Sequence, residues 1–312
     1  MTTHHEEAAP DWRFPLAVAR LHHVGRRRLR LLLQHAAGHH VTSKDAFAAF
    51  IEASAGELKM TVIAADVDRA WTEAVRLNTA CERRGWHLWV MGTPTYPPEL
   101  ARLHDPPALL FVHGPADLAV RPRVAIVGTR EPSPWGDATA RACAEAAVDA
   151  GATVVSGLAW GIDTAAHTAA VGRQGRTWAM LPSSLDIIYP SSNTALADRI
   201  VHHGGALVSE YPPGTHPHAT FFVERDRLQA ALSDAVIVIE TGLKGGTMHT
   251  VRFARELDVP VHVTFPDGAE PGPGGRADQL PDAQQGTWTL LQQGARRLAA
   301  AGVGDLVRSL RR

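Results

Sequence analysis

The stretch of sequence that decides the fold reads Arg123-Val-Ala-Ile-Val-Gly128-Thr-Arg130-Glu-Pro-Ser133 and is followed by Ala152-Thr-Val-Val-Ser156-Gly157-Leu-Ala-Trp160-Gly161-Ile-Asp163. Each half consists of a short apolar strand, a glycine-rich turn and the start of a helix. Such turns expose backbone N–H groups at a helix N-terminus, where phosphate groups bind. Two of them on neighbouring strands of one parallel sheet form a single crevice lined by anion-binding groups.

The same alternation of strand and helix continues to residue 264. We predict strands at 123–128, 152–156, 176–181, 206–209, 235–240 and 260–264, with helices near 135–150, 161–172, 193–203, 222–232 and 247–257. Two earlier strands are predicted at 86–90 and 108–112. Continuous apolar strands are typical of parallel strands that are covered on both faces. The pattern therefore predicts an α/β fold with a doubly wound, mostly parallel sheet.

The two ends of the chain differ from this middle part. Residues 13–78 show apolar spacings of three and four and no strand pattern, which is typical of helices. We therefore predict a small all-helical domain over residues 1–80 and an α/β domain over residues 81–312. Within the second domain, residues 266–286 are predicted to form a loop, and residues 290–311 are predicted to form one or two helices.

Composition limits the classes of partner and compartment. The 312 residues include 31 basic and 32 acidic side chains, so a polyanion would need a local basic patch. Cys81 and Cys143 form no disulfide or metal framework and are predicted to be buried free thiols. No apolar stretch reaches the roughly 18 residues of a membrane span, and no secretion signal is present. We expect a cytoplasmic protein with no membrane, metal or cofactor requirement.

Residues that follow three of the predicted strands are candidates for binding phosphate. The glycines among them let the backbone turn, and Arg130 and Lys244 supply positive charge. Close packing between a helix and a strand explains the glycines equally well. The full set is Gly128, Thr129, Arg130, Ser156, Gly157, Gly161, Lys244, Gly245, Gly246 and Thr247.

A segment before the fifth strand of this series combines two aromatic and two basic side chains, Phe221, Phe222, Arg225 and Arg227. Aromatic rings stack on the bases of single-stranded nucleic acid, while arginines bind its phosphates. The alternative is a helix whose phenylalanines are buried and whose arginines are solvated.

Catalytic patterns are weak by comparison. The carboxylates of Asp163, Glu210 and Glu240 follow strands and could converge, and Asp163 lies one helical turn before His167. No nucleophile elbow and no zinc-ligand spacing accompanies them. We therefore predict a binding crevice and assign no catalytic residue.

Taken in order, these segments resemble the DprA/Smf family of single-stranded-DNA-binding proteins over roughly residues 85–300. Beyond the two opening stretches and His167, the matching segments are Tyr96-Pro-Pro-Glu-Leu100, Pro106-Pro-Ala-Leu-Leu-Phe-Val-His-Gly114, Leu185-Asp-Ile-Ile-Tyr-Pro-Ser-Ser-Asn193, Ser209-Glu-Tyr-Pro-Pro-Gly214, Arg225-Asp-Arg227 and Gly286-Thr-Trp-Thr-Leu-Leu-Gln-Gln-Gly-Ala295. The N-terminal helices look like the small SAM-like module that such proteins often carry.

The resemblance implies an extended Rossmann-like fold without dinucleotide chemistry. It also implies a homodimer that binds and protects incoming single-stranded DNA and delivers it to the RecA recombinase in natural transformation. In the family the DNA pocket uses the arginine of the first glycine turn, here Arg130, and two arginines that correspond to Arg225 and Arg227. Lys244 would add charge near a further turn.

Several positions differ from the family pattern in charge. Trp160 stands where the family usually has arginine, Asp226 replaces asparagine between the two arginines, and Ser191-Ser192 replaces a cationic position. Each phosphate contact that is lost lowers both affinity and its salt dependence. Trp160 could compensate by stacking on a base, as could Phe221 and Phe222.

A second class of function is a sensor or enzyme for small nucleotides. Gly245-Gly246-Thr247 followed by Glu256 is similar to part of the signature of the "Lonely guy" phosphoribohydrolases, although one glycine is missing and the glutamate is more distant. The loss of positive charge would matter less for a mononucleotide than for a DNA strand.

Overall fold

The structure is a computed structural model that describes residues 11–36, 41–115, 120–271 and 275–311. The chain divides into two compact units. The first comprises Met1–Tyr96 and Pro107–Leu109, and the second comprises Pro97–Pro106 and Leu110–Arg312. The two glycine-rich stretches therefore lie in the second unit.

The described part of the first unit is helical up to residue 83, as the apolar spacing predicts. Its elements are α1 (Arg13–Val18), α2 (Arg26–His35), α3 (Lys44–Leu58), α4 (Ala64–Arg83) and strand β1 (Trp86–Val90). Leu16, Leu32 and Phe47 are fully buried, so each helix contributes its apolar face to a core. Residues 1–10 and 37–40 of the predicted helical domain lie outside the described residues, and the SAM-like type of that domain stays a prediction.

The strands of the α/β part match the predicted strands to within about two residues. They are β2 (Leu109–His113), β3 (Arg123–Val127), β4 (Thr153–Ser156), β5 (Thr177–Met180), β6 (Ala206–Ser209), β7 (Ala235–Val238), β8 (Val261–Val263) and β9 (Arg296–Arg297). Their order across the sheet is β2-β6-β5-β4-β3-β7-β8-β9. All neighbours pair in parallel except β2 and β6, which pair antiparallel with Phe111 opposite Ser209. This antiparallel pair and the short β9 are additions to the prediction.

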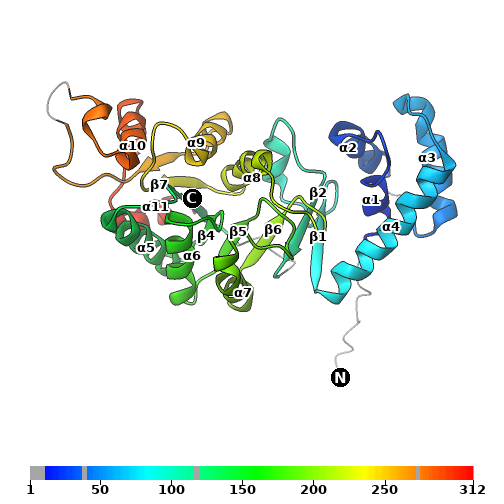
Figure 1. The fold of residues 1–312 in the computed structure, drawn as a ribbon, viewed down its shortest axis with the longest axis horizontal. Coiled ribbons are helices and arrows are strands. Elements are labelled where there is room, and N and C mark those ends of the chain that lie inside the picture. Colours follow the sequence, from blue (N-terminus) through cyan, green and yellow to red (C-terminus); the bar gives the residue numbers. More distant parts are fainter. Residues whose placement is uncertain (1–10, 37–40, 116–119, 272–274, 312) are drawn as a thin grey trace. The chain divides into compact units, whose positions relative to one another are not determined.

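Helices cover both faces of the sheet (Figure 1). Helices α5 (Pro134–Asp149), α6 (Ile162–Gly172) and α7 (Thr194–His202) pack on one face, with α11 (Val303–Ser309) against α5. Helices α8 (Ala219–Ala231), α9 (Gly246–Glu256) and α10 (Asp282–Gln292) pack on the other. Short 3₁₀ turns occur at Pro98–Arg102, Ser191–Asn193, Ala277–Gln279 and Ala300–Gly302. The predicted doubly wound α/β fold is thereby confirmed.

Two helix boundaries differ from the prediction. Helix α8 begins at Ala219 rather than near residue 222, and α10 begins at Asp282 inside the segment that was predicted to be a loop. The longer α8 matters for the site, because it includes both Phe221 and Phe222 in the first turn of a helix. None of the helices in the described residues has both the length and the apolar character that a membrane crossing requires.

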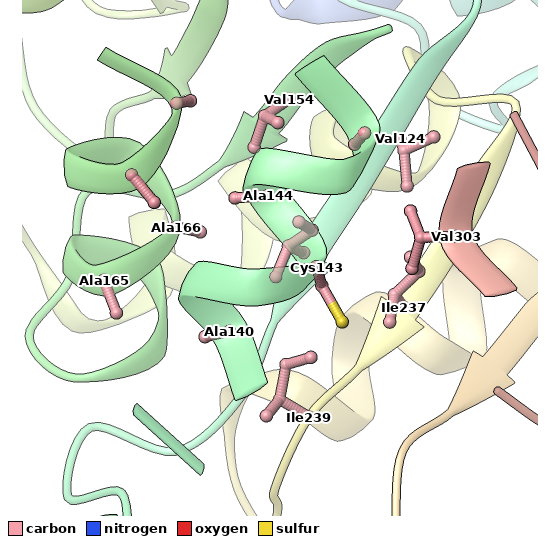
Figure 2. Close-up of a cluster of buried hydrophobic side chains, with 14 of the residues drawn as sticks. Val124, Ala140, Cys143, Ala144, Val154, Ala165, Ala166, Ile237, Ile239 and Val303 are labelled. Atoms are coloured by element: carbon pink, nitrogen blue, oxygen red, sulfur yellow. The ribbon is translucent and has the colours of Figure 1, made fainter. Parts of the chain in front are cut away.

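Small side chains hold α5 and α6 close to the sheet (Figure 2). Ala140 and Ala144 of α5 and Ala165 and Ala166 of α6 are buried in one cluster with strand valines and isoleucines. Cys143 is buried in this cluster, and its burial raises the pKa of the thiol to about 12. Both cysteines are buried and form no disulfide, as predicted.

The order of the strands creates a crevice above β3. From β3 the chain proceeds through β4 and β5 to β6 on one side, and then returns to β7 and β8 on the other side. The helices that follow β3 and β7 consequently cover opposite faces of the sheet. Ligands of doubly wound sheets bind at this type of switch point, outside the carboxyl ends of the strands.

Candidate phosphate-binding pocket

A pocket of about 400 Å³ lies at the switch point. Four segments line it: the turn after β3, the start of α6, the first turns of α8 and the turn between β7 and α9. Of the predicted phosphate-binding residues, the pocket gathers Gly128, Thr129, Arg130, Arg225, Lys244, Gly245, Gly246 and Thr247. Residues that are far apart in the sequence therefore meet in one place.

Close packing explains the glycine of the first turn. A Cβ on Gly128 would lie 2.5 Å from Ile162 Cγ1 and 2.9 Å from the carbonyl oxygen of Glu240. The next residue, Thr129, donates its backbone N–H to that same carbonyl oxygen at 2.7 Å. This hydrogen bond joins the turn after β3 to the turn after β7, and both of these turns line the pocket.

The start of α9 lines the pocket. Gly245 has a φ of 137°, a conformation that favours glycine, and Gly246 begins the helix. The first N–H groups of a helix have no partner within the helix, and they carry the positive end of its dipole. Exposed Lys244 and half-buried Thr247 flank this turn. The arrangement is a cradle for an oxyanion.

Arg130 offers an accessible positive charge at the same pocket. Its side chain is exposed and forms no ion pair within the described part of the chain, and its Cζ lies 5.3 Å from the centre of the Phe222 ring. The aromatic face holds the guanidinium through a cation–π contact. Arg130 can therefore bind an anion without first breaking a salt bridge.

Arg225 lies deeper and is already paired with carboxylates. It is 5% exposed, with Nη1 3.9 Å from Asp163 Oδ2 and Nε 3.3 Å from Asp226 Oδ1. Its Nη1 also donates to the carbonyl oxygen of Met180 at 3.3 Å. Gly157 makes room for it, because a Cβ there would lie 1.2 Å from Nη1. Two acids thus offset the charge of Arg225.

The remaining predicted phosphate ligands do not line the pocket. Arg227 donates from Nη2 to both carboxylate oxygens of Glu210, and the two side chains are 7% and 9% exposed. Ser156 donates its hydroxyl to the carbonyl oxygen of Ile126 at 2.7 Å. Gly161 has a φ of 75° and packs against the backbone of the Arg130 turn, where a Cβ would lie 2.5 Å from the Thr129 oxygen. These residues support the pocket from outside.

The three carboxylates that could have converged have separate partners. Glu240 is buried and accepts from the Ser133 hydroxyl at 2.7 Å and from the Ser133 N–H at 2.8 Å. Glu210 pairs with Arg227, and only Asp163 lines the pocket. His167 contacts the Thr177 hydroxyl at 2.7 Å, and burial lowers its pKa to about 3, so the ring is neutral near pH 7.

Charges of both signs line the pocket, in equal number. Arg130, Arg225 and Lys244 are balanced by Glu131, Asp163 and Asp226. Burial raises the pKa of Asp163, while Arg225 and hydrogen bonds from the backbone N–H groups of Gly157 and Ala159 act in the opposite direction. Burial also raises the pKa of Asp226, to about 7. Within the described residues, no three His, Cys, Asp or Glu side chains gather as metal ligands.

A row of aromatic rings extends outward from the pocket. Phe222 lies 5.5 Å from Tyr189, which lies 6.3 Å from Trp160, measured between ring centres. Trp160 is 50% exposed and Tyr189 is 37% exposed. Phe221 instead stacks on Tyr211 at 4.0 Å and does not belong to the row. Tyr189 is not among the predicted stacking residues, although its place in the loop after β5 could have indicated it.

The sequence of the chain matches a family of known proteins over most of its length. The family model described as DNA recombination-mediator protein A matches residues 87–310. A protein of Mycobacterium tuberculosis (strain H37Rv) that carries the name DprA is 41% identical over 197 residues, which are 62% of this chain and 48% of that protein. The chain thus spans about half the length of that curated relative.

Two solved structures share the fold at higher coverage. The crystal structure of DNA processing protein A from Streptococcus pneumoniae has a TM-score of 0.71 and 25% identity, and the match covers 94% of both chains. A structure that describes the single-stranded DNA binding mode of the Helicobacter pylori protein has a TM-score of 0.61 and 30% identity, covering 72% of this chain and 95% of that one. On the strength of a family match over most of its length and of these shared structures, the chain belongs to the DNA recombination-mediator protein A (DprA/Smf) family.

Proposed function

We propose that the protein binds single-stranded DNA and holds a backbone phosphate in the pocket. The observation that carries this proposal is the exposed guanidinium of Arg130, which lines the same pocket as Lys244 and the N-terminus of α9. A helix N-terminus and a planar guanidinium are complementary to a phosphate group. Membership in the DprA family and the binding described for the H. pylori relative support the same ligand.

The bases of the strand would stack on the aromatic row. Phe222 lies at the pocket, and the exposed faces of Tyr189 and Trp160 continue away from it. Stacking tolerates any base, because every base has a π face. Because the pocket binds a phosphate and the rings accept any base, the affinity should depend little on the DNA sequence.

The proposed cellular role follows from the family. We infer that the protein protects incoming single-stranded DNA and passes it as a homodimer to the RecA recombinase in the cytoplasm, without catalysis of its own. The description of the family as a recombination mediator supports this role. A strand bound through its phosphates, with exposed rings beneath its bases, can be transferred without a covalent step.

A salt series tests the proposed function. Fluorescence anisotropy of a labelled oligothymidylate would be measured with the full chain from low to moderate salt. Each phosphate whose counterions are released by a positive group of the protein contributes about −0.7 to the slope of log K against log salt for a single strand. We expect a slope of about −0.7 or steeper, because Arg130, Lys244 and the α9 terminus together hold one phosphate. Absence of binding at low salt would remove the proposal.

The pocket also suits a second ligand class, a mononucleotide. Its volume of about 400 Å³ is in the range of pockets that enclose small ligands. Competition separates the two functions. A nucleoside monophosphate that binds more tightly than the oligothymidylate, or that is hydrolysed, would favour a sensor or a phosphoribohydrolase-like enzyme.

Replacement of Trp160 tests the aromatic row. We expect Trp160→Ala to weaken oligothymidylate binding about fivefold, since one stacked base contributes about 1 kcal/mol or more. The melting temperature should remain unchanged, because the ring is half exposed and its Nε1 donates only to Ser192 Oγ at 3.1 Å. Trp160→Phe is the matched control and should retain most of the affinity. Equal affinity for all three proteins would show that no base stacks there.

A further inference from the structure

Asp226 is a carboxylate placed where the anion would bind. It lines the pocket and is 4% exposed. Its Oδ1 accepts a hydrogen bond from Gln229 Nε2 at 2.9 Å and lies 3.3 Å from Arg225 Nε. Its Oδ2 faces the start of α9, where a Cβ on Gly246 would lie 3.5 Å from it. The free oxygen of Asp226 and an incoming phosphate therefore compete for the same end of the helix.

The second buried acid, Asp163, accepts hydrogen bonds from the backbone. Its Oδ2 accepts the backbone N–H groups of Gly157 at 3.1 Å and Ala159 at 3.3 Å. Asp226 has the side-chain amide of Gln229 instead. Both acids share the single guanidinium of Arg225. Asp226 is consequently the acid that loses fewer hydrogen bonds when it accepts a proton.

Charged groups from every neighbouring segment line the pocket around Asp226, and the charges of Arg225, Asp163 and Arg130 act on its pKa. Arg225 belongs to its own helix, while Asp163 comes from α6 and Lys244 from the turn before α9. Arg130 and Glu131 come from the turn after β3. His167 of α6 stays neutral down to about pH 3, where its lowered pKa lies. Near neutral pH the positive charges are therefore constant, and the two buried acids have raised pKa values. Of these two, Asp226 is the acid whose Oδ2 faces the start of α9.

We propose that Asp226 couples DNA binding to protonation: one proton from solvent is taken up on its carboxylate as a phosphodiester enters the pocket. The proposal rests on the proposed function, because it requires a phosphate in this pocket. The neutral carboxyl then donates a hydrogen bond to a phosphate oxygen instead of repelling it. The protein holds single-stranded DNA more tightly as pH falls.

The direction of the pH dependence follows from the site. Burial raises the pKa of Asp226 to about 7 in the empty pocket, and a bound phosphate raises that pKa further, since like charges favour the neutral form. Between the free and the bound pKa one proton accompanies each binding event, and affinity falls as pH rises. A phosphodiester keeps its single charge throughout this range, so the titration belongs to the protein.

The experiment compares the wild-type protein with Asp226→Asn. Oligothymidylate affinity is measured by anisotropy from pH 6 to pH 8.5 at constant salt. We expect the wild-type dissociation constant to rise about tenfold between pH 7 and pH 8.5. Asp226→Asn should bind more tightly than wild type at pH 8.5 and should lack this rise, because an amide donates at every pH. Asp198→Asn, which removes an exposed acid from α7, is the matched control and should retain the wild-type profile.

A second measurement uses the wild-type protein alone. Calorimetry in two buffers with different ionisation enthalpies reports the number of protons taken up, and we expect a value approaching one at pH 7.5. Identical pH profiles for wild type and Asp226→Asn, or no proton uptake, would overturn the coupling and leave the DNA-binding function standing. Absence of oligothymidylate binding by every variant at every pH would overturn both.

Discussion

Replacing Arg225 with alanine is expected to lower the free energy of unfolding by about 3–5 kcal/mol at pH 8, the usual cost of leaving a buried charge without its partner. The guanidinium is the positive group between Asp163 and Asp226, and all three side chains are buried. Chemical denaturation of the full chain, monitored by tryptophan fluorescence, measures the loss. Loss of DNA binding in this variant would therefore say little about a direct phosphate contact.

The pH dependence of the same variant identifies the cause. Burial already raises the folded-state pKa of both acids, and loss of Arg225 raises them further. A raised folded pKa gives stability that is present at low pH and is lost as pH rises through that pKa. Arg225→Ala should thus lose less stability at pH 5 than at pH 8. Adding Asp163→Asn and Asp226→Asn should restore part of it at pH 8. A loss that is independent of pH and of these two substitutions would contradict the account.

Replacing Arg130 with alanine is expected to weaken oligothymidylate binding about 10- to 100-fold, because a hydrogen bond to a charged group contributes about 1.5–3 kcal/mol. The slope of log K against log salt should become shallower by up to about 0.7, the contribution of the one phosphate in the pocket. Stability should hardly change, because Arg130 is exposed and its described contact is with the Phe222 ring. Anisotropy across a salt series measures both quantities.

A matched variant distinguishes the contribution of the pocket to DNA affinity from that of positive charge elsewhere on the surface. Arg199→Ala removes an exposed arginine from the last turn of α7, on the face of the sheet opposite to α8 and α9. We expect Arg199→Ala to bind with nearly wild-type affinity. If both variants weaken binding equally, diffuse charge rather than the pocket carries the affinity.

The sequence predicts the frame of the site well, for a physical reason. Continuous apolar strands and the glycine turns that follow them are local patterns, and parallel strands place all their carboxyl ends at one edge. Gly128, Arg130, Lys244 and Gly246 therefore meet in one pocket as expected. The antiparallel pairing of β2 with β6 could not be predicted in this way, because it depends on contacts between residues far apart in sequence.

The direction of individual side chains was not predictable, because it depends on the phase of α8. Residues two apart on a helix point to different sides, so Arg225 faces the pocket while Arg227 faces Glu210. In the same way, Phe222 reaches Arg130 while Phe221 stacks on Tyr211. A helix predicted to start near residue 222 does not show which side of the helix faces the pocket. The structure also starts α8 earlier, at Ala219.

The central claim is that a DNA backbone phosphate occupies the pocket above β3 and β7. A crystal structure of the protein with a short oligothymidylate tests it most directly. We expect a phosphate oxygen within about 3.2 Å of the Arg130 guanidinium and of backbone N–H groups at the start of α9, a normal hydrogen-bond distance, with bases over Phe222, Tyr189 and Trp160. A strand ordered on another surface, with no phosphate in this pocket, would contradict the account.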